Sequence, residues 1–96
     1  MLQQVTVKTT NSTILKPLLE SAIENEKKIL SLGLGRTRKR LAEFEQKFDM
    51  TSAEFERRLN AFELTETVEF TDWRMEIGML NLLESQYQAL SEAKLD

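Results

Sequence analysis

The order of apolar and polar residues along the chain predicts three helices. Apolar residues recur at helical spacing over residues 17–48, which predicts a first helix roughly 48 Å long at 1.5 Å per residue. A short second helix is predicted over residues 52–61 and a third over residues 68–93. Pro17 suits the first position of a helix, which places Lys16 outside it.

The first thirteen residues follow a different pattern. Polar and apolar, β-branched residues alternate over residues 4–8, which predicts a short strand, and residues 9–13 have the composition of a loop. A single strand is not stable by itself. This strand or arm over residues 1–13 is therefore expected to pair with a copy of itself, to pair with another protein, or to remain disordered.

Two glycines interrupt the first predicted helix. Gly33 and Gly35 each cost about 1 kcal/mol relative to alanine in a helix interior. The helix is either kinked or broken there, or a second helix approaches it closely at Gly33. We favour a continuous or gently bent helix.

The signals between the first two helices are the sharpest in the chain. Thr51 and Glu54 form a capping box, in which the Thr51 hydroxyl accepts the N–H of Glu54 and the Glu54 carboxylate reaches back. Met50 and Phe55 hold the two positions of a hydrophobic staple. The side chains expected to pack together here are Phe44, Phe48, Phe55, Leu59 and Phe62.

Each long helix carries two apolar stripes. Short connections favour antiparallel neighbours, so the first and third helices are expected to form a hairpin with the short helix near its tip. Their main stripes face each other and form the core. The main stripe of the first helix consists of Leu19, Ile23, Leu30, Leu34, Leu41, Phe44 and Phe48, with Thr37 on the same line. That of the third helix consists of Trp73, Ile77, Leu80, Leu83 and Tyr87. Equal rotation away from the contact line brings the two secondary stripes onto one face of the hairpin. These stripes form the predicted dimer interface: Leu18, Ala22, Ile29, Leu32, Met75, Met79, Leu82 and Leu90.

A two-helix hairpin has little of its own to cover so wide a face. The third helix is apolar over about 220°, against the roughly 100° that a surface helix needs. Exposed patches of that extent are interaction sites or aggregation hazards. The predicted fold is therefore all-α: a long antiparallel helical hairpin with a short helix at the tip and a short N-terminal strand or arm, dimerising into a four-helix assembly. The alternative is that the short helix or the arm folds over the face.

Composition narrows the chemistry. The 96 residues are 41% apolar and 30% charged, with a net charge of −3, which is typical of a folded chain. The absence of Cys and His excludes zinc fingers, thiol nucleophiles and Ser-His-Asp triads. No apolar run reaches bilayer length and no signal peptide is recognisable, so we expect a cytoplasmic, cofactor-free protein without membrane contact. Catalysis by this chain alone is not expected.

Charge is distributed unevenly. The first fifty residues carry nine basic and six acidic side chains, and the rest carry four basic and ten acidic ones. Four basic residues cluster in the first helix, where only Arg36 and Arg40 share a face. The hairpin places Arg40 near Glu69, Asp72 and Glu76, so internal or dimer ion pairs are the simplest expectation. A nucleic-acid contact, which usually needs a larger one-sided basic patch, and an acidic partner are the alternatives.

Other candidate sites carry less chemistry. Close carboxylates such as Glu43 with Glu45 are expected to be solvated. Glu76 intrudes into the apolar arc of the third helix and is expected to form an ion pair or to border an interface. Metal binding is not expected, because the inward-facing positions are apolar. Residues 33–35 lack the context of a phosphate-binding loop.

The sequence at the helix starts, helix ends and turns resembles that of a known group of proteins. The segments that carry the resemblance are residues 15–26, 32–34, 43–55 and 70–73 together with Glu76. They resemble small prokaryotic helical proteins that are usually the antitoxin-like members of toxin–antitoxin gene pairs. The resemblance spans about residues 15–76 and implies a protein that binds and masks a partner toxin, such as an RNase of the RelE kind. It implies no catalytic residue, and Asp49 stands where that pattern has glycine.

Three functions remain open at this point. The first is an antitoxin-like, partner-binding module that uses the N-terminal strand by β-addition or the remaining apolar surface. The second is a DNA-binding regulator of the ribbon-helix-helix type, in which the first helix breaks at Gly33. The third is a homodimeric structural scaffold. The residues expected to contact a partner or a nucleic acid are Gln4, Thr6, Lys8, Arg36 and Arg40.

Overall fold

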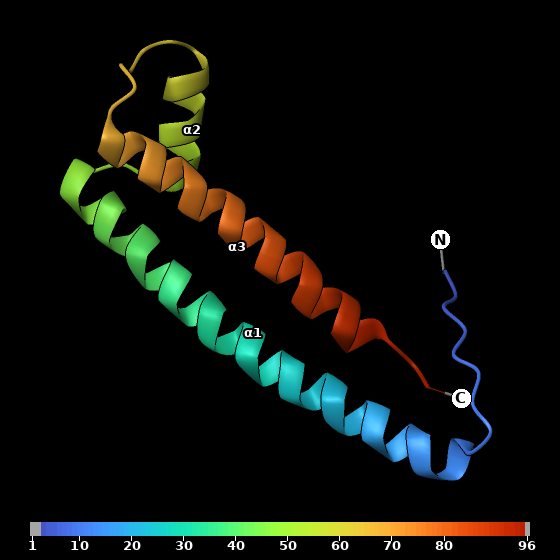
Figure 1. Ribbon diagram of the computed structural model, residues 1–96. Helices are drawn as coiled ribbons and strands as arrows, with labels where there is room; N and C mark the ends of the chain where they lie inside the picture. The colour runs from blue at the N-terminus through green and yellow to red at the C-terminus, as the bar shows by residue number, and fades with distance from the viewer. Residues whose placement is uncertain (1–2, 96) are drawn as a thin grey trace.

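The computed structural model describes residues 3–95 and is all-helical over that range. Its helices are α1 (Ser12–Phe48), α2 (Ser52–Asn60) and α3 (Val68–Glu92). α1 and α3 lie side by side as a long hairpin, and α2 sits at its closed end (Figure 1). This arrangement confirms the predicted all-α hairpin with a short helix at the tip. Residues 1, 2 and 96 of the predicted domain and arm lie outside the described range.

α1 begins five residues before its predicted start. The Asn11 side chain accepts a hydrogen bond from the N–H of Ile14 at 3.3 Å, so it caps the helix ahead of Pro17. Pro17 lies inside α1, where it removes one backbone donor in the second turn. The prediction that Lys16 lies outside the helix is therefore wrong, because an asparagine cap upstream outweighs the local restriction imposed by proline.

α1 passes through both glycines without interruption. The helix is continuous from Ser12 to Phe48. A Cβ atom built on Gly33 would lie 3.4 Å from Cδ1 of Leu83, whereas one on Gly35 would meet nothing within 4 Å. α3 thus approaches α1 closely at Gly33, which is the second of the two predicted alternatives. The other alternative, a break in the helix, is not observed.

The turn between α1 and α2 is built around Asp49. This residue adopts a left-handed conformation (φ 51°), and its backbone N–H bonds to the carbonyl of Glu45. Aspartate is one of the few residues besides glycine that enter this region readily. The turn therefore forms although glycine is absent from it.

Only one of the two hydrogen bonds of the predicted capping box forms at the start of α2. The Thr51 hydroxyl accepts a hydrogen bond from the N–H of Glu54 at 3.1 Å, as in a capping box. The Glu54 carboxylate does not turn back but accepts bonds from Arg57 and Arg58. A carboxylate still accepts a bond from the start of α2, but it belongs to Glu45 of α1, which accepts the N–H of Ser52 at 2.6 Å. The expectation that Glu45 is merely solvated is wrong.

An aromatic cluster fills the space enclosed by the three helices at the closed end, which we call the tip. Phe55 and Trp73 are fully buried, and their rings stack with centroids 4.0 Å apart. Phe44 and Phe48 stack on Trp73, at 5.6 and 5.7 Å. The indole N–H donates to the Ser52 hydroxyl at 2.9 Å, so no buried polar group of this ring lacks a partner.

Phe62 does not belong to this cluster. Its side chain is 92% exposed, and its backbone is left-handed with φ 59°. Its N–H bonds to the carbonyl of Leu59, and the N–H of Glu63 bonds to that of Arg58, which together make a Schellman ending for α2. The predicted packing of Phe62 is wrong because this ending turns the residue out of the helix face that Phe55 and Leu59 share.

The rest of the hairpin, which we call the shaft, has a thinner core. Its buried residues are Leu30, Leu34 and Thr37, all on the predicted main stripe of α1. Tyr87 of α3 is half-buried opposite them, and the Lys27 ammonium lies 5.6 Å from the centre of its ring. Two helices alone cannot surround a side chain, so most of the shaft positions remain partly open to solvent.

The N-terminal arm has no regular structure over residues 3–9 and extends away from the hairpin (Figure 1). Val5 is 91% exposed. The predicted strand over residues 4–8 is not formed within the described chain, because no second strand is available there to pair with it.

Candidate interaction surface

The two secondary stripes stay open to solvent. The exposed fractions in α1 are 60% for Leu18, 53% for Ile29 and 71% for Leu32. Ala22 is also exposed. In α3 the fractions are 67% for Met75, 47% for Met79 and 52% for Leu82, whereas Leu90 is half-buried. Seven of the eight residues predicted for the dimer interface are therefore exposed in the single chain.

Neither α2 nor the described part of the arm covers these stripes. α2 packs at the tip, where Phe55 is its buried side chain. All residues of the arm from residue 3 onward are exposed, and Figure 1 shows the arm leaving the start of α1 apart from the two long helices. The alternative that the chain covers its own apolar face is therefore not realised over residues 3–95.

The amount of apolar surface is typical of an association site. The six large side chains of the stripes together expose on the order of 600 Å² per chain, against about 800 Å² per partner in a standard protein interface. Charged residues interrupt the α1 stripe only at Arg36, one turn after Leu32. The α1 stripe is therefore uninterrupted by charge from Leu18 to Leu32, whereas Met79 and Leu82 of α3 lie nearer the tip, between the Gly33–Leu83 and Arg40–Glu76 contacts.

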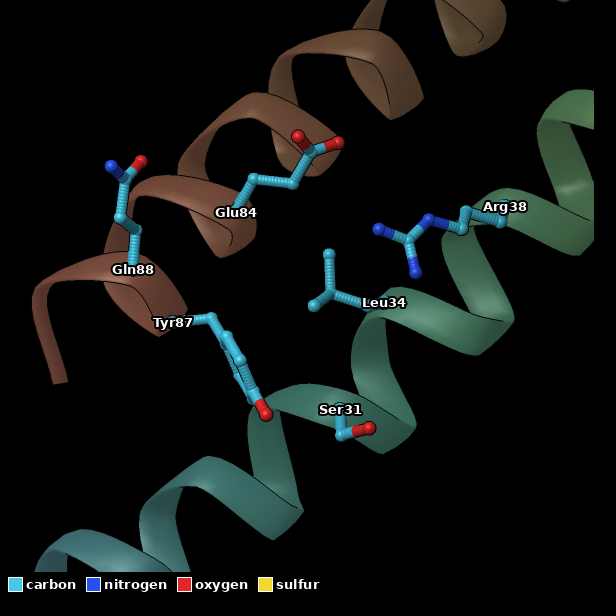
Figure 2. Close-up of a pocket in the computed structure, with 6 residues that line it drawn as sticks. All are labelled: Ser31, Leu34, Arg38, Glu84, Tyr87 and Gln88. Atoms are coloured by element: carbon cyan, nitrogen blue, oxygen red, sulfur yellow. The ribbon is translucent and has the colours of Figure 1, made fainter. Parts of the chain in front are cut away.

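The opposite side of the shaft is polar. Nine residues rotate a helix by two and a half turns, so residues nine apart lie on opposite sides of it. Arg38 is nine residues from Ile29 in α1, and Gln88 is nine residues from Met79 in α3. An open groove of about 370 Å³ lies here between α1 and α3 (Figure 2). Its lining residues are Ser31, Leu34, Arg38, Glu84, Tyr87 and Gln88. The shaft thus has one apolar and one polar face.

The polar groove is open to solvent. Figure 2 shows the Arg38 and Glu84 side chains extending toward each other across the groove. Most of its lining side chains are exposed to water. Over residues 3–95 no cluster of three acidic side chains is arranged to hold a metal ion.

The predicted pairing of the basic segment with α3 is present. The Arg40 guanidinium lies 3.2 Å from the Glu76 carboxylate, and Lys47 pairs with Glu69 nearer the tip. Arg36 is exposed, like Arg40. These contacts hold the two helices in register, and exposed pairs of this kind contribute little stability each.

The strongest electrostatic feature is on α2. The Glu54 carboxylate accepts bonds from Arg57 at 2.8 and 3.1 Å and from Arg58 at 2.8 Å. The hydrogen bonds from Arg57 and then Arg58 lower the pKa of Glu54 from its ordinary 4.5 to about 2. These bonds join neighbouring turns of α2 on its surface.

The predicted contact residues of the arm are all accessible. Gln4, Thr6 and Lys8 are exposed, as are the residues between them. They form no β-strand in the described chain. The structure also does not bring them together with Arg36 or Arg40.

Comparison with protein-family models, with curated proteins and with solved structures found no significant match. No helix within residues 3–95 combines the length and the apolar character needed to cross a lipid bilayer.

Proposed function

We propose that this chain is a non-catalytic, antitoxin-like interaction module that forms a homodimer through its apolar face and binds a partner toxin. The observation that carries the proposal is the exposure of the two stripes, from 47% to 71% for their large side chains in α1 and α3. A face of this extent is unfavourable in water unless another surface covers it.

A second copy is the simplest cover. Burying four to six of these side chains at about 1.5 to 3 kcal/mol each gives a gross gain on the order of 10 kcal/mol per chain. Part of this gain offsets the loss of rigid-body freedom on association. The proposal requires the remainder to be favourable, which gives a dimer of two hairpins and hence a four-helix assembly.

Binding of a toxin rests on the sequence resemblance and on the arm. Residues 3–9 extend from α1 with unpaired backbone groups and alternating β-branched side chains. Such a segment suits addition to the edge of a sheet in another protein, because the sheet supplies the missing hydrogen bonds. A two-stranded ribbon made by two arms alone is only marginally stable, so the arm favours a partner protein.

The ribbon-helix-helix alternative is not part of the proposal. It requires α1 to turn at Gly33, and α1 is continuous from Ser12 to Phe48. A plain homodimeric scaffold would show the same dimer and would bind no toxin, so a partner experiment separates it from the proposed module.

The dimer is tested with a charge placed in the stripe. Met79→Glu puts a carboxylate in the middle of the apolar face, and Asn81→Glu adds the same charge to an exposed polar position two residues away. Light scattering is expected to give twice 11.2 kDa for the wild type and for Asn81→Glu, and 11.2 kDa for Met79→Glu. Circular dichroism checks that both variants remain helical. A monomeric wild type, or a dimer that Met79→Glu leaves intact, contradicts the proposal.

The partner is tested by co-expression with the product of the adjacent gene in the native genome. The proposal expects that product to arrest growth when expressed alone, and expects this chain to restore growth and to co-purify with it. Deletion of residues 3–9 should weaken the complex while leaving the helical content unchanged. A neighbour that is harmless, or that does not bind the chain, counts against the toxin assignment and leaves the scaffold.

A further inference from the structure

The junction between the N-terminal arm and α1 has the form of a strand–loop–helix connection. Residues 4–8 alternate as in a strand, and three residues separate them from the start of α1 at Ser12. The last of the three is Asn11, whose side chain caps the helix by accepting the N–H of Ile14. Short loops that end in such a capping residue join a strand to the helix that follows it in α/β units.

The first turns of α1 have no helix facing them in the hairpin. Lys27 lies over Tyr87, and α3 ends at Glu92, little more than one turn further on. α1 continues from Lys27 back to Ser12, so about three of its turns extend beyond the end of α3, at the blue end of α1 in Figure 1. Ile14 is 61% exposed in the first of these turns and lies outside the predicted dimer interface.

The strand pattern gives the arm two different sides. In an extended strand, residues 5 and 7 point to one side and residues 4, 6 and 8 to the other. Val5 and Val7 are 91% and 59% exposed, whereas the other side carries Gln4, Thr6 and Lys8. A strand of this kind fits the edge of a sheet that has one apolar face and one face in water.

The charge of this segment favours a partner protein over a second copy. Lys8 and Lys16 are exposed, and no acidic side chain precedes Glu20 in the sequence. Two arms of this chain would bring only like charges together, whereas a sheet edge with acidic side chains would attract each of them. A two-stranded ribbon of two arms is in addition only marginally stable.

We infer that residues 4–8 and the first turn of α1 dock together, as a strand and its helix, on a sheet edge that carries acidic side chains in a partner protein. The inference rests on the proposed function, because it specifies the surface that the partner presents. The backbone of the arm pairs with the edge strand, and Val5 and Val7 point toward the apolar face of the sheet. Ile14 packs on that same face, as the helix of a βα unit does.

The two parts of this docking unit match in size. Five residues of strand span about 17 Å, and three turns of helix span about 16 Å. The part of α1 that extends beyond α3 is therefore as long as the strand beside which it would lie. Docking then leaves the contact between α1 and α3 in place.

Asparagines placed along the arm test the assignment of its two sides. The probe is the product of the adjacent gene, and its dissociation constant from the full chain is measured by calorimetry. Val5→Asn and Val7→Asn should each weaken binding about tenfold, because each buries an amide against the apolar face. Thr6→Asn places the same side chain between them on the water side and should leave binding nearly unchanged. A Thr6→Asn variant as weak as the two valine variants overturns the inference.

A matched pair of variants tests the helix contact. Ile14→Asn should also weaken binding about tenfold, whereas Thr13→Asn, at the exposed neighbouring position, should not. Circular dichroism of the free variants verifies that α1 is retained. If the valine variants weaken binding and Ile14→Asn does not, strand and helix do not dock as one unit, which overturns the inference.

Salt tests the charge of the edge. Binding should weaken as the ionic strength rises, and this dependence should become smaller in the double variant Lys8→Gln, Lys16→Gln, because screening acts on the charges that the variant removes. A dissociation constant that does not depend on salt contradicts an acidic edge.

The remaining outcomes separate the inference from the proposed function. A neighbour that all five asparagine variants bind and neutralise equally well overturns the inference and leaves the antitoxin-like module standing. A harmless neighbour that binds with the expected pattern supports the inference and contradicts the toxin assignment. A neighbour that does not bind the chain overturns both. The chain has no cysteine of its own, so a Thr6→Cys variant that links to itself under mild oxidation shows arms paired with each other and also overturns the inference.

Discussion

At the tip, three helical segments enclose an aromatic cluster in which Phe55 and Trp73 are completely buried. In the shaft, two helices share a single line of contact, and the large side chains beside it stay half exposed. The aromatic residues differ between the two regions, since all five phenylalanines and the tryptophan lie between residues 44 and 73. The number of surrounding elements differs as well, and two cylinders can bury only the positions between them.

The comparison indicates which part of the fold is self-sufficient. The tip is closed by side-chain contacts from α1, α2 and α3, by two helix caps and by the hydrogen bond from the Trp73 indole to Ser52. The apolar face of the shaft stays open in the single chain. The tip is therefore the part of the fold whose core the chain completes by itself.

The largest expected effect is on the tip core. Phe55→Ala removes the ring stacked on Trp73 and should lower the free energy of unfolding by about 3 to 5 kcal/mol. Leu30→Ala, at a buried position in the shaft, should cost less, about 2 kcal/mol, because water can enter the site. Urea unfolding followed by circular dichroism measures both. Equal losses in the two variants would mean that the tip is no better enclosed than the shaft.

A smaller effect of opposite sign is expected at the end of α2. Phe62 holds a left-handed conformation that glycine adopts without strain, and its ring is almost fully exposed. Phe62→Gly should therefore stabilise the chain by about 1 kcal/mol and raise the melting temperature by roughly 4 °C. Phe62→Ala keeps the strain and serves as the control. A destabilised glycine variant would show that the ring makes contacts that the single chain does not contain.

The smallest effect is the pH dependence contributed by Glu54. Its pKa is lowered to about 2 in the folded chain and is near 4.5 when unpaired, so its ion pairs with Arg57 and Arg58 contribute fully above pH 4.5. That contribution is lost as the pH falls from 4.5 through 2. As the pH is lowered from 6 to 2, the melting temperature should therefore fall less steeply for Glu54→Gln than for the wild type. Parallel curves would mean that these pairs do not stabilise the tip.

Much of the fold follows from periodicity and capping signals. The main stripe of α1, including Thr37, was predicted to face α3, and this face is the buried one. α2 and α3 begin at the predicted residues because Thr51 and Thr67 supply side-chain caps. Signals of this kind are local, so a single sequence is sufficient to locate them.

The departures from prediction depend on contacts between distant residues or on competing local signals. Glu45 caps α2 from across a turn, which only the three-dimensional path of the chain can bring about. Phe62 has the spacing of a core residue, yet the helix ending turns it outward. The stripes were identifiable from the sequence, since their exposure follows from there being only two long helices. What covers them is a property of a second molecule, so the dimer stays a prediction.

Trp73 is the only tryptophan, and it lies fully buried against Phe55 at the tip, whereas the only tyrosine, Tyr87, lies in the shaft. The chain therefore carries one natural fluorophore in each of its two regions. Indole emission follows the opening of the tip, and phenol emission follows changes along the shaft. Opening of the tip and opening of the shaft can thus be followed as separate optical signals in an unlabelled sample.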